Sequence, residues 1–344
     1  MKIREIAKLA GVSVSTVSRV TNNYTNVPKE TRDKVMSVIN KYGYIANSSA
    51  RILTGKQNKT LGLFIVEFLD NPSNNIILPS IWFSNIIAAV VNYASAKNYN
   101  TLVTLITNKK ALKKAKEQFA NKSICGGIFV GAENTVEEIN EFDRLGYKIA
   151  LLEQKKDENS SRNNSIFVNT DNTKGAYEAT KYLIDNGHKK IVHIMGNKKK
   201  SPTLDRINGY KKALSEAKIP FEKTLIIKGE YQQNIAYENV KNLIEEEVFF
   251  SAIFAASDDM AFGAIKALRE KGKRIPDDVS IIGYDDTIIA KLENFSSVKA
   301  HADDMADILV NQLINCVENK DKIASSYIVE STLEIRNSIK NMIN

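Results

Sequence analysis

The chain has 344 residues, of which 43% are hydrophobic and 26% are charged, and it contains only 6 prolines. This composition excludes a disordered or collagen-like protein, and the length predicts two or three globular domains of about 150 residues. The two cysteines, Cys125 and Cys316, are far apart in the sequence, which excludes a disulfide scaffold and a cysteine zinc cluster. We expect a cytoplasmic protein with no membrane contact, because no stretch approaches the roughly 18 apolar residues of a membrane helix and residues 1–8 lack the apolar run of a signal peptide.

The positive charge is concentrated at the N-terminus. The chain carries a net charge of +8, and residues 1–60 contain 11 Lys and Arg against 3 acidic residues. The remaining residues balance, with 37 basic and 37 acidic side chains. A small, strongly basic segment is suited to neutralising a phosphate backbone, so it predicts binding to double-stranded DNA. The alternative, a solubilising tail, is disfavoured by the helical patterning of the segment.

Three short helical patterns occupy this basic segment. Apolar residues at helical spacing run through 3–10, Gly11 interrupts them, and Ser13 offers an N-cap for a second helix. A third amphipathic run lies between Pro28 and Gly43. Helix, tight glycine turn and helix, followed by a supporting helix, predict a three-helix helix-turn-helix domain.

The polar face of the second helix presents groups that can read DNA. Arg19 can pair bidentately with guanine, and Ser15 or Ser18 can bond a base edge or a phosphate. Val14 is apolar, so it would contact a thymine methyl group or only fit the groove. Such a pattern is only moderately specific for DNA binding.

The sequence of this segment is more specific than its pattern. The run IREIAKLAGVSVSTVSRV at 3–20, with Thr31-Arg32 and Gly43-Tyr44 further on, closely resembles the N-terminal signature of the lactose/galactose repressor (LacI/GalR) family of bacterial transcriptional regulators. The resemblance implies that Val14 and Ser15 read bases in the major groove, with Arg19 one turn later. The DNA-contacting residues that we expect in this domain are Ser13, Val14, Ser15, Thr16, Ser18, Arg19 and Asn22.

The segment 47–56 connects the basic head to the neutral body. Taken by itself it is either a flexible connector or a short helix that is unstable alone. It also resembles the hinge helix of the family, which implies that it folds when two subunits meet over the centre of an operator. Leu53 then matches the leucine that enters the minor groove and kinks the DNA, with Ala50 beside it as a DNA contact.

Short apolar strands alternate with amphipathic helices throughout the body. The strands expected in the first half are 61–66, 101–105, 127–130 and 148–152, with helices near 82–97, 109–121 and 135–145. After the polar segment 155–164 the strands expected are 166–168, 191–195, 225–227, 252–255 and 279–282. This repetition predicts an α/β fold with parallel sheets, and the polar break predicts two lobes.

The body is similar to the two-lobed periplasmic-binding-protein fold of that family, as far as the run LEIRNS at 333–338. The resemblance implies three crossings of the chain between lobes. The expected division is a helix-turn-helix domain at 1–46, a hinge helix and linker at 47–60, and an effector-binding and dimerisation domain at 61–344. Within the last, we expect lobe one at about 61–160 and 295–325, and lobe two at about 163–293 and 326–340.

Ligands of parallel α/β sheets bind at the carboxyl ends of the strands, which in a two-lobed body face a shared cleft. Arg206 and Asp285 stand where the family keeps a ligand-clamping arginine and aspartate, and such groups can each hold two adjacent hydroxyls of a sugar. For both residues the alternative is a surface ion pair. The expected effector contacts are Phe68, Phe83, Glu153, Arg206, Tyr231, Ser257 and Asp285, with Asp70 and Trp82 as further candidates of which Trp82 can equally be core.

An enzyme is the competing class of protein. The sequence has no G-x-G-x-x-G after a strand, no phosphate-binding P-loop, no H-E-x-x-H and no G-x-S-x-G. The paired aspartates open helical segments, where they complement the helix dipole, and the run Lys198-Lys199-Lys200 is expected to be a solvated loop. We therefore expect no enzymatic activity, no cofactor and no metal.

Together these features predict a sequence-specific transcriptional regulator that acts as a homodimer or a larger oligomer and binds a palindromic operator. We expect a repressor of a carbohydrate-utilisation operon, controlled allosterically by a sugar or sugar derivative bound between the lobes, with a purine-like corepressor as the alternative ligand. Neither the identity of the effector nor whether it releases or promotes DNA binding follows from the sequence.

Overall fold

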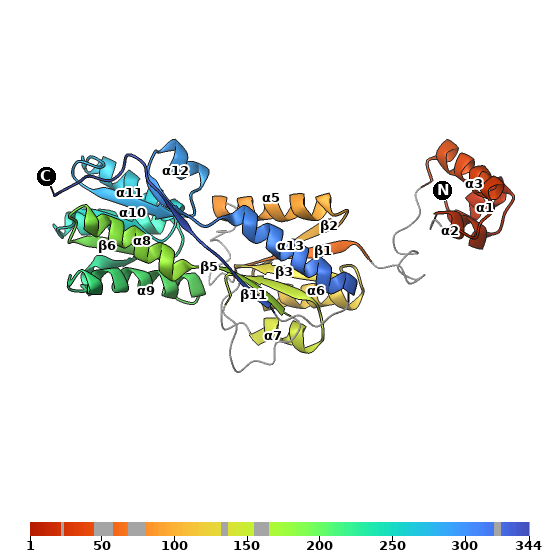
Figure 1. Ribbon diagram of the computed structural model, residues 1–344, viewed down its shortest axis with the longest axis horizontal. Coiled ribbons are helices and arrows are strands. Elements are labelled where there is room, and N and C mark those ends of the chain that lie inside the picture. Colours follow the sequence, from red (N-terminus) through yellow and green to blue (C-terminus); the bar gives the residue numbers. More distant parts are fainter. Residues whose placement is uncertain are drawn as a thin grey trace. The chain divides into compact units, whose positions relative to one another are not determined.

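The computed structural model describes residues 1–21, 24–44, 58–67, 80–131, 137–154, 165–319 and 325–343. The chain separates into two compact units, residues 1–58 and 59–344 (Figure 1). We call the first unit the head and the second the body.

The head contains three helices, α1 (Ile3–Ala10), α2 (Val14–Thr21) and α3 (Lys29–Tyr42). Gly11 ends α1 with a φ of 61°, in the left-handed region that glycine adopts without strain. The core of the head is formed by Ile6, Ala7, Ala10, Val17, Val20, Val27 and Val35. The three expected helices are therefore present and share one small core.

The first lobe of the body is a six-stranded parallel sheet in the order β11-β5-β4-β3-β1-β2. Its strands are β1 (Thr60–Val66), β2 (Asn100–Ile106), β3 (Gly126–Val130), β4 (Ile149–Leu152), β5 (Ser165–Thr170) and β11 (Ser325–Val329). Its helices are α5 (Ile81–Ala96), α6 (Lys109–Ala120), α7 (Glu137–Arg144) and α13 (Ala302–Asn319). Alternate residues of β1 are buried on opposite faces, Leu61 and Leu63 with α5 and α13, and Phe64 with α6 and α7.

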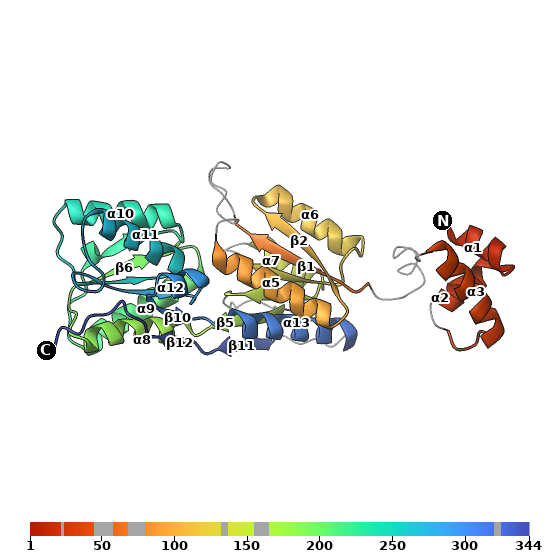
Figure 2. The same cartoon turned by 90° about the horizontal axis from the view of Figure 1, so that it is seen from above.

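The second lobe repeats this design with the sheet order β12-β10-β9-β8-β6-β7 (Figure 2). Its strands are β6 (Ile191–Met195), β7 (Ile226–Lys228), β8 (Ala252–Ala255), β9 (Ser280–Tyr284), β10 (Ser296–Lys299) and the antiparallel β12 (Thr332–Glu334). Its helices are α8 (Asn172–Asp185), α9 (Ser201–Glu216), α10 (Gln233–Glu245), α11 (Asp258–Glu270) and α12 (Ile288–Leu292), with a 3₁₀ turn, η1 (Lys223–Leu225). Side chains of α8 and α9 pack on one face of the sheet, and those of α10 and α11 on the other.

The chain crosses between the lobes three times, after β5, after β10 and after β11. The strand at 166–168, which the polar break assigned to the second lobe, instead pairs with β4 in the first. Similarly, β10 lies in the second lobe although 295–325 was expected in the first, and β11 lies in the first although 326–340 was expected in the second. Strand pairing and not local polarity decides these memberships, because a polar connection can join two strands of one sheet.

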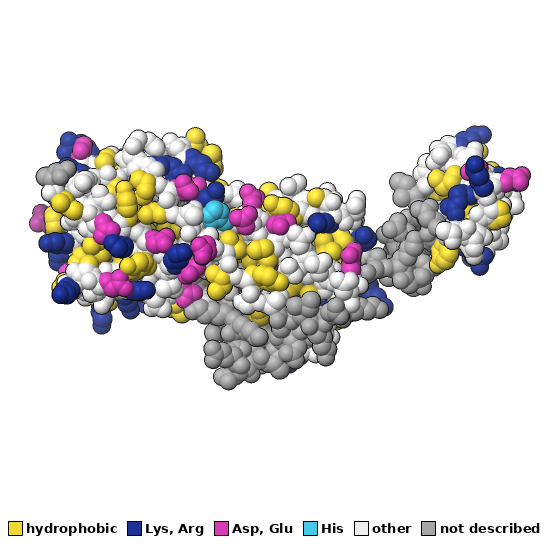
Figure 3. Space-filling model, in the orientation of Figure 1, with side chains coloured by type: hydrophobic (Ala, Val, Ile, Leu, Met, Phe, Trp, Pro, Cys, Tyr) yellow, Lys and Arg dark blue, Asp and Glu magenta, His cyan; other side chains and the backbone are white. Residues whose placement is uncertain are grey.

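Charged side chains of both signs are interspersed on one face of the body (Figure 3). On the face drawn in Figure 3, Lys and Arg side chains alternate with Asp and Glu side chains without a large area of one sign. This agrees with the balanced charge of residues 61–344. Among the described helices, none has the length and apolar character needed to cross a bilayer.

His193 on β6 provides a test of this packing through pH. Its ring is fully buried between those of Tyr210 and Phe254, and burial lowers its pKa from 6.5 to about 4. Between these pH values the unfolded chain binds a proton that the folded chain does not, so stability that is present above pH 6.5 is lost as the pH falls toward about 4. The loss is about 3 kcal/mol at roughly 1.36 kcal/mol per pKa unit. The variant His193→Phe keeps a stacked ring but has no group that titrates. Between about pH 7 and about pH 4, we expect its free energy of unfolding in urea to fall by about 3 kcal/mol less than that of the parent protein. An identical pH dependence in both proteins would contradict this assignment.

Candidate functional site

The candidate DNA-reading surface of the head is the exposed side of α2. Val17 and Val20 are buried in the core of the head, so Val14, Ser15 and Arg19 are exposed on the other side. Exposure of a guanidinium, a hydroxyl and an apolar side chain on one helix is what reading base edges in the major groove requires.

The start of α2 is fixed by a small hydroxyl network. The Ser13 hydroxyl accepts a hydrogen bond from the Thr16 backbone N–H at 3.1 Å, and it lies 2.7 Å from the Ser15 hydroxyl and 2.8 Å from that of Thr16. Ser13 therefore acts as the expected N-cap, and Ser18 is half-buried on the next turn. Three of the expected DNA contacts, Asn22, Ala50 and Leu53, lie outside the described residues, as does the expected hinge helix.

The body contains a cavity lined by both lobes at the carboxyl ends of their strands. Every expected effector contact that the structure describes lines this cavity, namely Phe83, Glu153, Arg206, Tyr231, Ser257 and Asp285. Trp82 lines it as well, while Phe68 and Asp70 lie outside the described residues. We call this cavity the cleft site.

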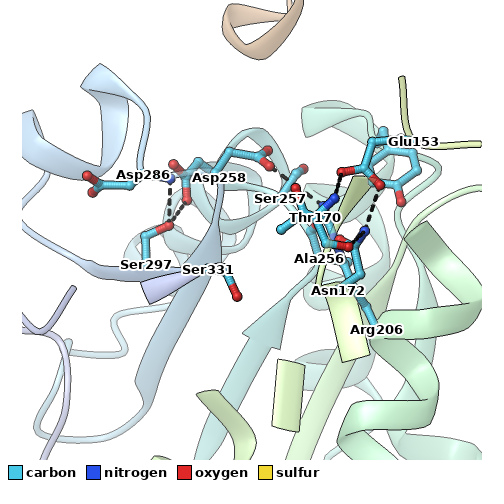
Figure 4. Close-up of polar contacts among 12 residues, drawn as sticks. Glu153, Thr170, Asn172, Arg206, Ala256, Ser257, Asp258, Asp286, Ser297 and Ser331 are labelled. Carbon is cyan, nitrogen blue, oxygen red and sulfur yellow. Dashed lines mark hydrogen bonds and ion pairs between the residues drawn. The ribbon is translucent and has the colours of Figure 1, made fainter. Parts of the chain in front are cut away.

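Arg206 on α9 is only 5% exposed and lies at the centre of a set of polar contacts in the cleft site. Its Nε donates to Asn172 Oδ1 at 2.9 Å, and another guanidinium nitrogen donates to the Ala256 carbonyl oxygen (Figure 4). Its Cζ lies 3.6 Å from the centre of the Tyr284 ring, and Nη2 lies 3.8 Å from Asp285 Oδ1. A planar guanidinium held by four neighbours is preorganised for a bidentate contact with a ligand.

Glu153 directly follows β4 and reaches Arg206 through Asn172. Its carboxylate accepts from the Thr170 backbone N–H at 3.0 Å and from Asn172 Nδ2 at 2.7 Å. Burial raises the pKa of the Glu153 carboxyl, and the positive charge of Arg206 partly opposes that rise. Since Glu153 stands in the first lobe and Arg206 in the second, this chain of hydrogen bonds links the two lobes at the base of the cleft site.

Asp285 follows β9 on the second lobe, with a φ of 106°. Its backbone N–H donates to the Val298 carbonyl at 2.6 Å, which fixes the strained turn. Burial raises the pKa of the Asp285 carboxyl well above its usual range, against the opposing charge of Arg206. The neighbouring Asp286 turns away and pairs with Arg336 Nη2 at 2.6 Å, so only the first aspartate of the pair reaches the cleft site.

Aromatic rings form the remaining wall. The centres of the Trp82 and Phe83 rings lie 5.1 Å apart, edge to face, on the first lobe. On the second, the Tyr231 hydroxyl lies 2.9 Å from the Thr203 hydroxyl. A Cβ at Gly196 would lie 2.1 Å from the Tyr231 ring, so glycine is required there for the ring to take its place. Faces of aromatic rings are suited to the apolar faces of sugar rings and to cations.

Four charged residues that line the cleft site, Glu67, Lys200, Glu230 and Asp259, were not predicted from the sequence. Lys200, expected in a solvated loop, has a side chain only 12% exposed and pairs with Glu67 at 2.5 Å across the lobes. Asp259, expected only to complement a helix dipole, also lines the cleft site, and burial raises its pKa to about 6. Of these residues, only Glu67 had a signal in the sequence that could have placed it in the cleft site, because it directly follows the first strand of the body.

These features define a class of protein, in which a helix-turn-helix head for DNA is joined to a two-lobed body with a ligand cleft. Residues 2–47 match the family described as bacterial regulatory proteins, lacI family, and residues 180–339 match the periplasmic binding protein-like domain.

Similar proteins extend over the whole chain. The transcriptional regulator MalR of Clostridium butyricum is 34% identical over 96% of this chain and 98% of its own length. The ribose operon repressor of Haemophilus influenzae is 31% identical over 99% of both chains. The crystal structure of the lac repressor dimer bound to operator and an anti-inducer superposes with a TM-score of 0.84 at 22% identity, over 99% of both chains.

The chain belongs to the lacI family of bacterial regulatory proteins. It is a DNA-binding transcriptional regulator, and both the family and the fold class predicted from the sequence are confirmed.

Proposed function

We propose that this regulator is a cytoplasmic homodimeric repressor of a carbohydrate-utilisation operon, controlled by a sugar bound in the cleft site. The observation that carries the proposal is the convergence of Arg206 and Asp285 beside the rings of Phe83 and Tyr231. A guanidinium and a carboxylate can each hold neighbouring hydroxyls while a ring packs on the face of the sugar. The name of the ribose operon repressor, a relative over the full length, supports a carbohydrate operon as the target.

We assign a separate function to each of three successive segments of the chain. Residues 1–46 bind DNA, with Ser13, Val14, Ser15, Thr16, Ser18, Arg19 and Asn22 at the major groove. Residues 47–60 form a hinge with Ala50 and Leu53 in the minor groove, and residues 61–344 bind the effector and the second subunit. The effector contacts are Phe68, Phe83, Glu153, Arg206, Tyr231, Ser257 and Asp285.

Ligand and DNA binding are coupled through the crossings between the lobes. A sugar that contacts Glu153 on the first lobe and Arg206 on the second favours one relative position of the lobes. Because β1 of the first lobe follows directly on the hinge, that position changes how two hinges meet over the operator. The coupling is reciprocal, so the operator changes the affinity for the sugar by the same factor.

The homodimer would use the outer edge of the first lobe. Val103 and Leu105 lie on the edge strand β2, are each 41% exposed and pair with Leu63 and Ile65, so they share the face that carries α5. Val91 on α5 is 40% exposed. An edge strand with exposed apolar side chains is a surface through which two copies can associate.

Val103→Asp is expected to convert the dimer to monomer. Each dimer would bury the charge twice. At about 2 kcal/mol or more for each valine, the dimer loses about 4 kcal/mol or more, which raises the dissociation constant about 1000-fold or more. Sedimentation equilibrium measures the dissociation constant of the dimer directly. Leu145→Asp, at a leucine that is 54% exposed beyond α7, is the control and should leave the dimer intact. Dimers of unchanged stability in Val103→Asp would exclude this face as the interface.

Selection of genomic DNA fragments by the full-length protein, at about 0.15 M salt to weaken phosphate contacts, tests the proposed function. We expect a palindrome of roughly 14–20 base pairs with a flexible central step, beside genes for sugar uptake or breakdown. If no common sequence is recovered, repetition with sugars and purines present tests whether a corepressor is required. Failure in all conditions would refute the proposal. Incubation with candidate sugars should give binding without turnover, which separates this function from an enzyme.

A further inference from the structure

We propose that the cleft site selects a sugar that carries a protonated amine over the matching neutral or anionic sugar. This inference rests on the proposed function, because it concerns the chemical class of effector taken by the same site. Three observations support it: the charge of the cavity, the position of Asp259 without a cation paired to it among the described residues, and the aromatic and acidic surroundings of Lys200.

The cleft site has more carboxylates than cations. Its described lining residues include five carboxylates and two cations, namely Glu67, Glu153, Glu230, Asp259 and Asp285 against Lys200 and Arg206. Arg206 is engaged by Asn172, the Ala256 carbonyl, Tyr284 and Asp285, and Lys200 is paired with Glu67. Burial raises the pKa of Glu153 and Asp285 and so favours their neutral forms. The three other carboxylates still outnumber the two cations. A phosphate or carboxylate on the ligand would therefore meet an excess of negative charge, and a positive charge on the ligand would reduce that excess.

Asp259 is the carboxylate best placed to meet a ligand amine. It lies in the first turn of α11 on the second lobe, and Ser80 of the first lobe partly opposes the rise of its pKa. Within the described ranges, no lysine or arginine forms an ion pair with Asp259. A half-buried carboxylate without a cation is costly, and a ligand ammonium beside it would remove part of that cost.

The surroundings of Lys200 have the chemistry that holds an ammonium. Its Nζ lies 5.9 Å from the ring centre of Phe83 on the first lobe and 5.9 Å from that of Tyr231 on the second, with Glu67 completing the site. Aromatic faces and a carboxylate attract a cation together, and the attraction is stronger where water is excluded. The wall of the cleft site thus already accommodates one ammonium group, and the same two rings face the cavity in which the ligand would lie.

Matched sugars test the proposal on the full-length protein. Isothermal titration at about pH 7 would compare glucose, glucosamine, glucuronate and glucose 6-phosphate, with the corresponding galactose and mannose sets, because amines are protonated and carboxyls ionised there. In the set that binds, we expect the amine to bind at least tenfold more tightly than its neutral parent, and the anionic members to bind most weakly. Asp259→Asn should reduce the ratio of amine to neutral affinity to near one. Asp277→Asn, at an exposed carboxylate on the second lobe, should leave that ratio unchanged.

The outcomes separate this inference from the proposed function. Tightest binding by a neutral or anionic sugar overturns the amine selectivity and leaves a sugar-responsive repressor in place. An unchanged ratio in a folded Asp259→Asn protein, verified by circular dichroism, overturns the role of Asp259. If no sugar in any set binds while the protein still selects a palindrome, both the amine selectivity and the sugar effector are wrong, and only the DNA-binding part of the proposed function survives.

Discussion

Arg206→Ala is expected to abolish the response of operator binding to sugar while leaving operator affinity without sugar unchanged. The guanidinium contacts Asn172, the Ala256 carbonyl and Asp285, and its removal takes away the bidentate contact proposed with the ligand. Fluorescence anisotropy of a labelled operator, with and without the sugar, measures the response. The ratio of the two operator affinities should fall to about one, from the roughly 5–150-fold typical of allosteric coupling.

This substitution also removes a charge that the buried acids require. Glu153 and Asp285 would lose their cation, so we expect a loss of unfolding free energy of about 3–5 kcal/mol. Arg206→Lys keeps the charge and loses the planar fork, and it should lose the sugar response with a smaller loss of stability. Arg274→Ala, at an exposed arginine of the second lobe, should respond normally. A normal sugar response in either Arg206 variant would show that the cleft assignment is wrong.

Arg19→Ala is expected to reduce operator affinity strongly and to broaden the set of sequences bound. Arg19 is exposed on α2, and a bidentate contact with guanine contributes about 1–3 kcal/mol of discrimination. A dimer carries two such contacts, so the loss is about 2–6 kcal/mol, or roughly 30-fold to 10⁴-fold. Competition between operator and nonspecific DNA, measured at several salt concentrations, checks the result.

Arg4→Ala is the matched control, because it removes the same charge from α1 of the same small domain. A phosphate contact contributes affinity without sequence preference, so this variant should weaken binding to all DNA alike and reduce the salt dependence by about one ion per subunit. If Arg19→Ala behaved in the same way as Arg4→Ala, Arg19 would contact phosphate and not a base.

The head was predictable from short stretches of sequence. Helix spacing, the glycine at position 11 and the cap at Ser13 act within a few residues, and the structure contains the three helices that they predict. Several cleft residues were also predictable, because Glu153 and Asp285 directly follow strands and parallel strands end at one edge of a sheet. The family signature added Arg206, which lies within a helix and has no such local mark.

Other features depended on contacts between distant segments. The pairing of β5 with β4 placed it in the first lobe, although the polar segment before it suggested the second. Leu9 and Tyr42, which fit the helical spacing of apolar residues, are 49% and 45% exposed, because each helix of the head packs only on the side that faces its partners.

By itself, the sequence determined a basic DNA-binding head, a body of alternating strands and helices and several of the residues at the carboxyl ends of the strands. Only the tertiary structure decided which strands share a sheet and that Lys200, Glu67 and Asp259 lie in the cleft site. The physical reason is the range of the interactions. Helix periodicity, caps and strand ends act between near neighbours, whereas an ion pair that joins two lobes forms only after both sheets have folded and faced each other.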